Sequence, residues 1–270
     1  MLSKLLKHEF RATGRIMLPV FLMLLTSAGL FNLFLRLSGQ YDYPALSVLQ
    51  GLFSTIFFIT LIGTAVASFI LMIYRFYKNY MKDEGYLMFT LPVTTGQLIW
   101  SKLIVALVWS VATILVILGS VALALLGQPF WREVTPYLNQ AWQFITTQVS
   151  SGNLAGFIVE FILYIILAPL ASYLMIYASI ALGHTSSNHK ILLSVIIYFG
   201  LNTAIQTVTS FGSVFGILAI SEGKLADFVP KDPISFIHTV VISTLILALI
   251  ECALFYLITH STLKKRLNLQ

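Results

Sequence analysis

The sequence predicts an all-α membrane protein with six transmembrane helices, and three observations support that fold class. Of the 270 residues, 58% are hydrophobic and only 10% are charged, and the mean hydropathy is +0.91. A soluble domain carries roughly a quarter charged residues, so this chain has too few to cover a surface that faces water. Six long runs contain almost no charge, and a helix that crosses a bilayer needs ~20 such residues. Because backbone polar groups cannot stay unpaired in hydrocarbon, these runs predict helices.

The expected spans follow from the positions of these runs. They cover about 16–35, 52–74, 98–126, 154–182, 191–211 and 236–259. The segments that join them are short, and none reaches the ~40 residues below which a domain seldom folds without help. We therefore expect one transmembrane domain over 1–270, with no soluble catalytic domain.

The Lys and Arg residues predict which side of the membrane each segment faces. Twelve of the 16 lie in or beside segments on one side of the predicted bilayer, and four lie on the other. Cytoplasmic loops collect Lys and Arg, so both termini are expected in the cytoplasm, in a multi-pass protein of the cell (plasma) membrane. The basic residues spread along one face and form no single patch with stacking aromatics. The net charge of +6 therefore does not indicate a nucleic-acid partner.

Residues 1–15 have the pattern of a basic amphipathic helix. Leu2, Leu6 and Phe10 fall on one helical face, and basic side chains occupy the others. Such a helix lies in the cytoplasmic interface, with its charges at the lipid headgroups. Two roles stay open, an anchor that only fixes topology or a helix that transmits motion to the first span. The residues singled out in this interfacial helix are Lys4, Lys7, Phe10 and Arg11.

The predicted cytoplasmic loop 75–97 carries more apolar side chains than such a loop needs. The acidic pair 83–84 suits a helix N-terminus, where the dipole favours negative charge, and an apolar ridge over 87–91 follows. Thr94 and Gln97 form a capping-box pattern that would begin the third span. A mixed apolar and charged patch at the inner membrane edge indicates a docking surface, or else a helix lying flat on lipid. The candidate docking residues are Lys82, Asp83, Glu84, Gly85, Tyr86, Leu87, Met88, Leu91 and Pro92.

At this loop the chain resembles the ABC exporter permeases of the type-2 class. The resemblance rests on the runs Asp83-Glu84-Gly85-Tyr86-Leu87 and Leu91-Pro92-Val93-Thr94, followed by Lys102 at the start of the next span. Six spans, internal termini and a leading amphipathic helix also match the family's layout. Two departures leave the subfamily open. The family typically has Gly-Thr at Gly85-Tyr86, and often Arg or Lys where this chain has Thr95-Gly96.

The resemblance implies partners as well as a fold. In that family the loop holds a coupling helix that docks into a cytoplasmic ATP-binding-cassette ATPase subunit. It implies a second permease, identical or related, and a location in a bacterial plasma membrane. ATP and Mg would be bound by the ATPase, and no cofactor by this chain.

Two predicted extracellular connections have features of their own. In 127–153, apolar residues recur every three or four positions from Trp131 to Val149, which predicts an amphipathic helix against the outer leaflet. It would be a staple between spans three and four, or a lid or cargo-binding surface. In 212–235, Gly212 and Gly216 interrupt an apolar run, which suggests a short re-entrant helix before span six. The family resemblance implies the same feature.

Two acidic residues, Glu160 and Glu251, fall inside predicted spans. An ionisable residue there is costly unless it is paired or hydrated, so both are functional candidates. Glu160 is within two turns of the outer end of span four and could reach water. Glu251 is deeper and is the better candidate to line a polar path or to pair across helices. The alternative for Glu251 is a protonated, hydrogen-bonded structural role.

No motif indicates catalysis or metal binding by this chain. A phosphate-binding loop, a zinc-protease helix and a nucleophile elbow are all missing from the sequence. His184 and His189 share a short loop without a carboxylate or thiol, so we expect solvated side chains and no metal site.

The resemblance implies a permease subunit, and the missing catalytic motifs give no indication of an enzyme. The permease would move an apolar or amphipathic substrate, such as a peptide toxin, antimicrobial peptide or lipophilic drug, out of the cell. A separate ATPase would drive alternating access. The Tyr-, Phe- and Met-rich spans suit such a substrate, because these side chains adapt to varied shapes. The alternative is a polytopic membrane enzyme or sensor with no ATPase partner.

Overall fold

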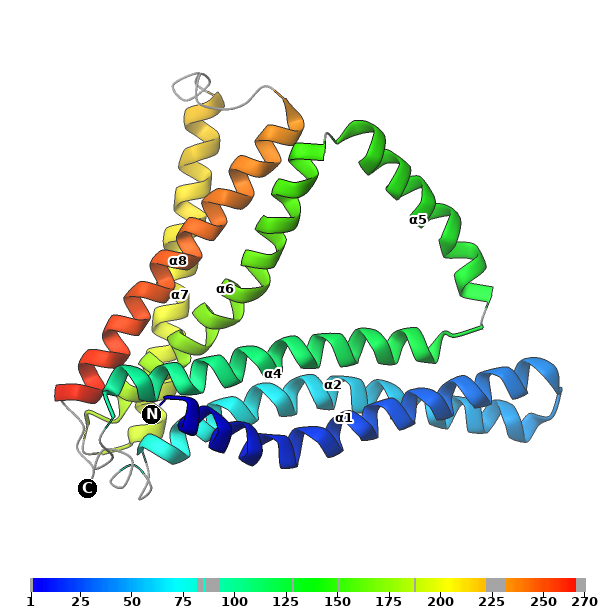
Figure 1. Ribbon diagram of the computed structural model, residues 1–270, viewed down its shortest axis with the longest axis horizontal. Coiled ribbons are helices and arrows are strands. Elements are labelled where there is room, and N and C mark those ends of the chain that lie inside the picture. The colour runs from blue at the N-terminus through cyan, green and yellow to red at the C-terminus, as the bar shows by residue number, and fades with distance from the viewer. Residues whose placement is uncertain are drawn as a thin grey trace. The chain divides into compact units, whose positions relative to one another are not determined.

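The computed structural model describes residues 2–81, 85, 93–127, 129–149, 151–186, 188–221 and 232–265. Over these residues the chain is helical, with no strand (Figure 1). Six of the helices are long and apolar enough to cross a membrane. The all-α class and the six span-length helices are therefore confirmed, and the chain is a multi-pass membrane protein.

The helices extend beyond the predicted apolar runs at most of their ends. Their bounds are α1 Leu2–Gln40, α2 Pro44–Met81, α4 Thr95–Ala124, α5 Pro129–Gln148, α6 Ser151–Gly183, α7 Lys190–Ser221 and α8 Pro233–Lys265. Large apolar side chains are exposed along their length, among them Leu22, Ile59 and Phe161. A soluble protein rarely exposes contiguous apolar surface on this scale, whereas lipid would cover it.

The chain forms two compact units. The first contains 1–75 and 100–147, and the second contains 76–99 and 148–270. Residues of α2 and α4 contribute to both, because the unit boundaries fall inside these helices.

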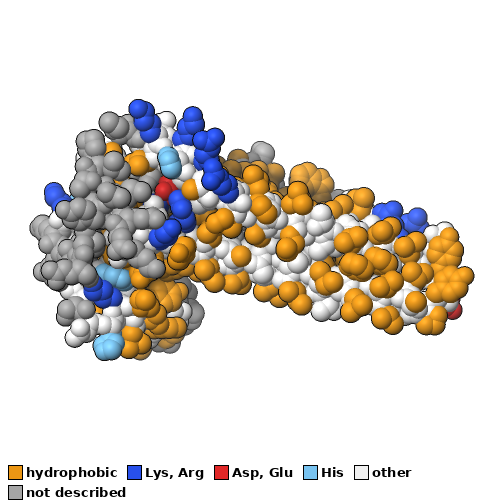
Figure 2. All heavy atoms as spheres, turned by 90° about the horizontal axis from the view of Figure 1, so that it is seen from below, with side chains coloured by type: hydrophobic (Ala, Val, Ile, Leu, Met, Phe, Trp, Pro, Cys, Tyr) orange, Lys and Arg blue, Asp and Glu red, His pale blue; other side chains and the backbone are white. Residues whose placement is uncertain are grey.

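In the first unit, α1, α2 and α4 lie side by side (Figure 1). Leu24, Phe57 and Ala124 are buried together, and Phe31 stacks on Phe57 with 5.6 Å between ring centroids. The Asn32 amide donates to the carbonyl oxygens of Ala124 and Leu126, each at 2.9 Å. These bonds satisfy acceptors that the end of α4 leaves without a helical partner. Hydrophobic side chains cover much of this unit's surface, and Lys and Arg gather near the N-terminal end of α1 (Figure 2).

In the second unit, α6 packs against both α7 and α8. Phe76, at the end of α2, stacks on Tyr177 of α6 with centroids 3.8 Å apart and planes within 5°. Tyr80 packs edge-on against Phe76 and donates its hydroxyl to the Leu98 carbonyl at 2.9 Å. The predicted capping box is also present. Thr94 and Gln97 exchange backbone-to-side-chain hydrogen bonds of 3.3 Å, and α4 begins at Thr95.

The N-terminal segment is helical as predicted, but it is not a separate helix. It continues without a break into the first span, because α1 runs from Leu2 to Gln40 and accommodates Pro19. Lys4, Lys7 and Arg11 are exposed on its first turns, and Phe10 is half-buried. The position of these residues in a membrane interface stays a prediction.

The helix of span five does not end near 211 as predicted, and Gly212 and Gly216 lie inside it. Helix α7 continues through both glycines to Ser221, because a glycine inside a helix costs only about 1 kcal/mol relative to alanine. Residues 222–231 lie outside the described residues, and so does that part of the expected re-entrant segment. The other expected helix is present as α5, and its contact with the outer leaflet stays a prediction.

Candidate functional site

Most of the predicted docking residues are not described by the structure. Lys82, Asp83, Glu84, Tyr86, Leu87, Met88, Leu91 and Pro92 all lie outside the described residues. Gly85 is described and is buried. A Cβ added to it would lie 2.6 Å from the Tyr80 carbonyl oxygen, so any larger residue would push against the backbone at the end of α2.

Glu251 lies on α8 and is half-buried. It lines a cavity of about 290 Å³ among α6, α7 and α8. Ser172, Asn202 and Thr209 line the same cavity, so polar groups from three helices converge at this carboxylate. The structure therefore puts Glu251 beside polar space within the apolar bundle.

Glu160 lies on α6 and does not reach water as the sequence suggested, because its exposure is only 8%. Its Oε1 accepts a hydrogen bond from Nδ1 of His238 on α8, at 2.7 Å. The His238 ring stacks on Phe157 with centroids 3.8 Å apart. Its Cε1 would lie 3.0 Å from a Cβ added at Gly156. Phe157 and Gly156 thus fix the His238 ring, which in turn holds the carboxylate.

The second oxygen of Glu160 is different. Oε2 is buried and has no hydrogen-bond partner among the described residues. Glu160 also lines a cavity of about 520 Å³ formed by α6 and α8. A buried polar atom without a partner is rare in folded proteins and calls for a physical explanation.

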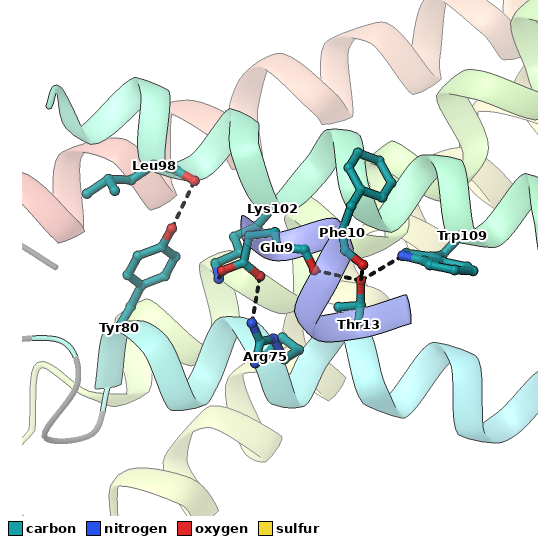
Figure 3. A network of polar contacts seen from close by, with 8 residues as sticks. All are labelled: Glu9, Phe10, Thr13, Arg75, Tyr80, Leu98, Lys102 and Trp109. Atoms are coloured by element: carbon teal, nitrogen blue, oxygen red, sulfur yellow. Dashed lines mark hydrogen bonds and ion pairs between the residues drawn. The ribbon is translucent and has the colours of Figure 1, made fainter. Parts of the chain in front are cut away.

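A second buried carboxylate, Glu9 of α1, was not anticipated (Figure 3). Its Oε1 lies 2.5 Å from Nζ of Lys102 on α4, and its Oε2 lies 3.1 Å from Nη2 of Arg75 on α2. The side chains of Glu9 and Lys102 are 7% and 4% exposed. One carboxylate therefore joins three helices through charge-assisted contacts.

The same part of α1 is held by a second set of contacts (Figure 3). Thr13 donates its hydroxyl to the Glu9 carbonyl at 2.8 Å, and Nε1 of Trp109 donates to the Thr13 hydroxyl oxygen at 2.8 Å. Phe10 packs near Trp109, with 6.5 Å between centroids. These contacts fix the first turns of α1 against α4.

A signal for Glu9 was present in the sequence. Glu9 is the one acidic residue in the basic segment 1–15, and Lys102 lies in an otherwise apolar run. A lysine on an apolar helix is almost never fully buried unless it is paired, so this isolated acid was a candidate partner. Helical periodicity alone could not predict the contact between Glu9 and Lys102, because these residues are far apart in the chain.

The expected solvated state of His184 is wrong. His184 is 5% exposed, and its Nδ1 lies 2.8 Å from the Ile180 carbonyl oxygen. Burial, and secondarily the nearby Lys190 charge, lower the pKa of His184 although the Ile180 hydrogen bond opposes them. Within the described ranges, no group of three His, Cys, Asp or Glu side chains could hold a metal ion.

Comparison with known proteins adds no family assignment. The chain matches no protein-family model, no curated protein and no solved structure.

Proposed function

We propose that this protein is the transmembrane permease subunit of an ATP-driven exporter for apolar or amphipathic substrates. One observation carries the proposal, the combination of six span-length apolar helices with a 75–97 loop that resembles a coupling loop. The connections between the helices are too short to contain an ATPase domain. In this proposal the energy for transport comes from a separate cytoplasmic ATPase, which binds ATP and Mg.

The Glu9 network supports a mechanical role for the helix ends beside this loop. Arg75 begins the predicted loop and Lys102 follows it, and both contact the same carboxylate on α1. Closure of the ATPase subunits would push on residues 82–91. The adjoining ends of α2 and α4 would then move together with α1, because separating them would leave buried charges without partners. A second permease, identical or related, would complete the transport pathway.

The cavity at Glu251 supports a route for the substrate. Polar side chains are expensive within apolar helices unless they line a cavity or pair with each other, and here they line a cavity. Alternating exposure of such a space to the two sides of the membrane would move a substrate outward.

The coupling loop is tested by affinity purification of the tagged chain from its native membrane in mild detergent. We expect an ATPase with a phosphate-binding loop to co-purify, and its recovery to fall in Glu84→Lys or Leu87→Asp. The matched control is Glu133→Lys, which makes the same charge change at an exposed position on α5. The proposal is overturned if no ATPase is recovered, or if all variants recover it equally. The second outcome would favour a membrane enzyme or sensor without an ATPase partner.

A further inference from the structure

The α6–α8 cavity at Glu160 has a distinctive lining. Its other residues are Phe157, Ile158, Phe161, Tyr164, Val241 and Thr244. Glu160 is the one charged residue among them, and three of the others are aromatic. The cavity, at about 520 Å³, is in the size range of sites for small organic molecules.

The carboxylate in this cavity is held in place but is only half satisfied. His238 occupies Oε1, and the stacked Phe157 ring limits how far the imidazole can turn. Oε2 is buried without a hydrogen-bond partner among the residues that the structure describes, so of the two oxygens it is the one left for a ligand.

The chemistry of the lining selects the class of ligand. A hard metal ion requires six or more oxygen ligands, whereas this lining offers few beyond the Glu160 carboxylate. A neutral apolar molecule would fill the cavity but leave Oε2 unsatisfied. An organic cation suits both the carboxylate and the aromatic lining of the cavity. Its N–H donates to the carboxylate, and aromatic faces attract its charge.

We propose that this cavity binds a hydrophobic monovalent ammonium ion, with its N–H groups on Oε2 of Glu160. Its apolar body lies against Phe157, Phe161 and Tyr164. The inference deepens the proposed function and rests on it, since it names amphipathic amines as the substrate class. The same ammonium chemistry is found in free amines and in the ethanolamine headgroup of a lipid.

The test measures binding to the full chain alone, in phosphatidylcholine nanodiscs without an ATPase. The probe is radiolabelled 1-aminoadamantane, a compact primary ammonium at neutral pH, and 1-adamantanol is its neutral competitor. We expect saturable binding, with the alcohol competing at least about tenfold more weakly than unlabelled amine. Glu160→Gln should weaken amine binding by at least about tenfold, because it removes the charge and keeps the shape.

Matched controls separate recognition from folding. Glu133→Gln removes an exposed carboxylate on α5 that lines neither cavity, and should retain the wild-type affinity. Phe161→Ala should weaken binding severalfold. Phe199→Ala should not, because Phe199 is similarly exposed and lines neither cavity. The phenylalanine pair keeps the test valid if Glu160→Gln fails to fold.

Three outcomes would overturn the proposal: no saturable binding, equal affinity for amine and alcohol, or unchanged affinity in both Glu160→Gln and Phe161→Ala. A repeat in nanodiscs that contain phosphatidylethanolamine identifies the source of the ligand. If that lipid displaces the probe, the site holds a headgroup. If the probe stays bound, the site is for free amines. Because no ATPase is present, failure here is distinct from failure of the co-purification test.

Discussion

The two buried carboxylates Glu9 and Glu160 differ in how completely the protein satisfies them. Both are nearly inaccessible, with exposures of 5% and 8%. Glu9 has a cation at each of its oxygens, Lys102 on one and Arg75 on the other. Glu160 has His238 on one oxygen and no described partner on the other.

This difference separates a structural role from a binding role. A buried charge is better compensated when each of its oxygens has a partner, and Glu9 meets that condition through contacts from α1 to α2 and α4. A carboxylate that keeps a free oxygen beside a cavity retains part of its desolvation cost until a ligand arrives. Glu9 therefore stabilises the fold, and Glu160 is available for recognition.

Glu9→Gln is the change with the largest expected effect on this comparison. The amide keeps the size of the side chain but removes the negative charge between two cations. Lys102, 4% exposed, would remain buried without its counter-charge, which typically costs about 3–5 kcal/mol. We expect a marked drop in the melting temperature of the purified protein in detergent. Glu133→Gln, on the exposed face of α5, is the control and should melt as the wild type does. A wild-type melting curve for Glu9→Gln would remove the structural role from this network.

Lys102→Met tests the same Glu9 network and should have a smaller effect on stability. Methionine fills a similar volume in a buried position, and Glu9 keeps its contact with Arg75 at 3.1 Å. The pair that remains is neutral, so the expected loss is on the order of 1 kcal/mol, the scale of a single buried contact. Thermal unfolding in detergent measures this loss of stability, with Glu9→Gln measured beside it for comparison. A loss as large as that of Glu9→Gln would mean that Arg75 does not support the carboxylate alone.

The fold was largely accessible from the sequence, because lipid imposes a simple rule. Long apolar runs must be helices, and the local pattern at Thr94 and Gln97 also identified the start of α4. The ends of the helices were harder to predict from the sequence. Glycine slightly disfavours a helix but does not stop one when apolar residues continue on both sides, as at Gly212 in α7.

The candidate site was harder to predict from the sequence because it depends on contacts between distant residues. The sequence identified Glu160 as an intramembrane acid, but no pattern links it to His238, which lies 78 positions later. The same holds for Glu9 and Lys102. A period along one helix shows which residues share its face, and it carries no information on which face of another helix they meet.

Glu160→Gln, without ligand, has the smallest expected effect on stability and tests the other half of the comparison. Its amide oxygen still accepts from His238, and Oε2 has no described partner to lose. The unfolding free energy should therefore change by less than about 1 kcal/mol, and removal of an incompletely solvated charge offsets part of any loss. Melting in detergent, beside Glu9→Gln at the same pH, provides the measurement. A destabilisation equal to that of Glu9→Gln would show that Oε2 already has a partner within the protein, and the proposed ammonium contact would then lose the unsatisfied acceptor on which it rests.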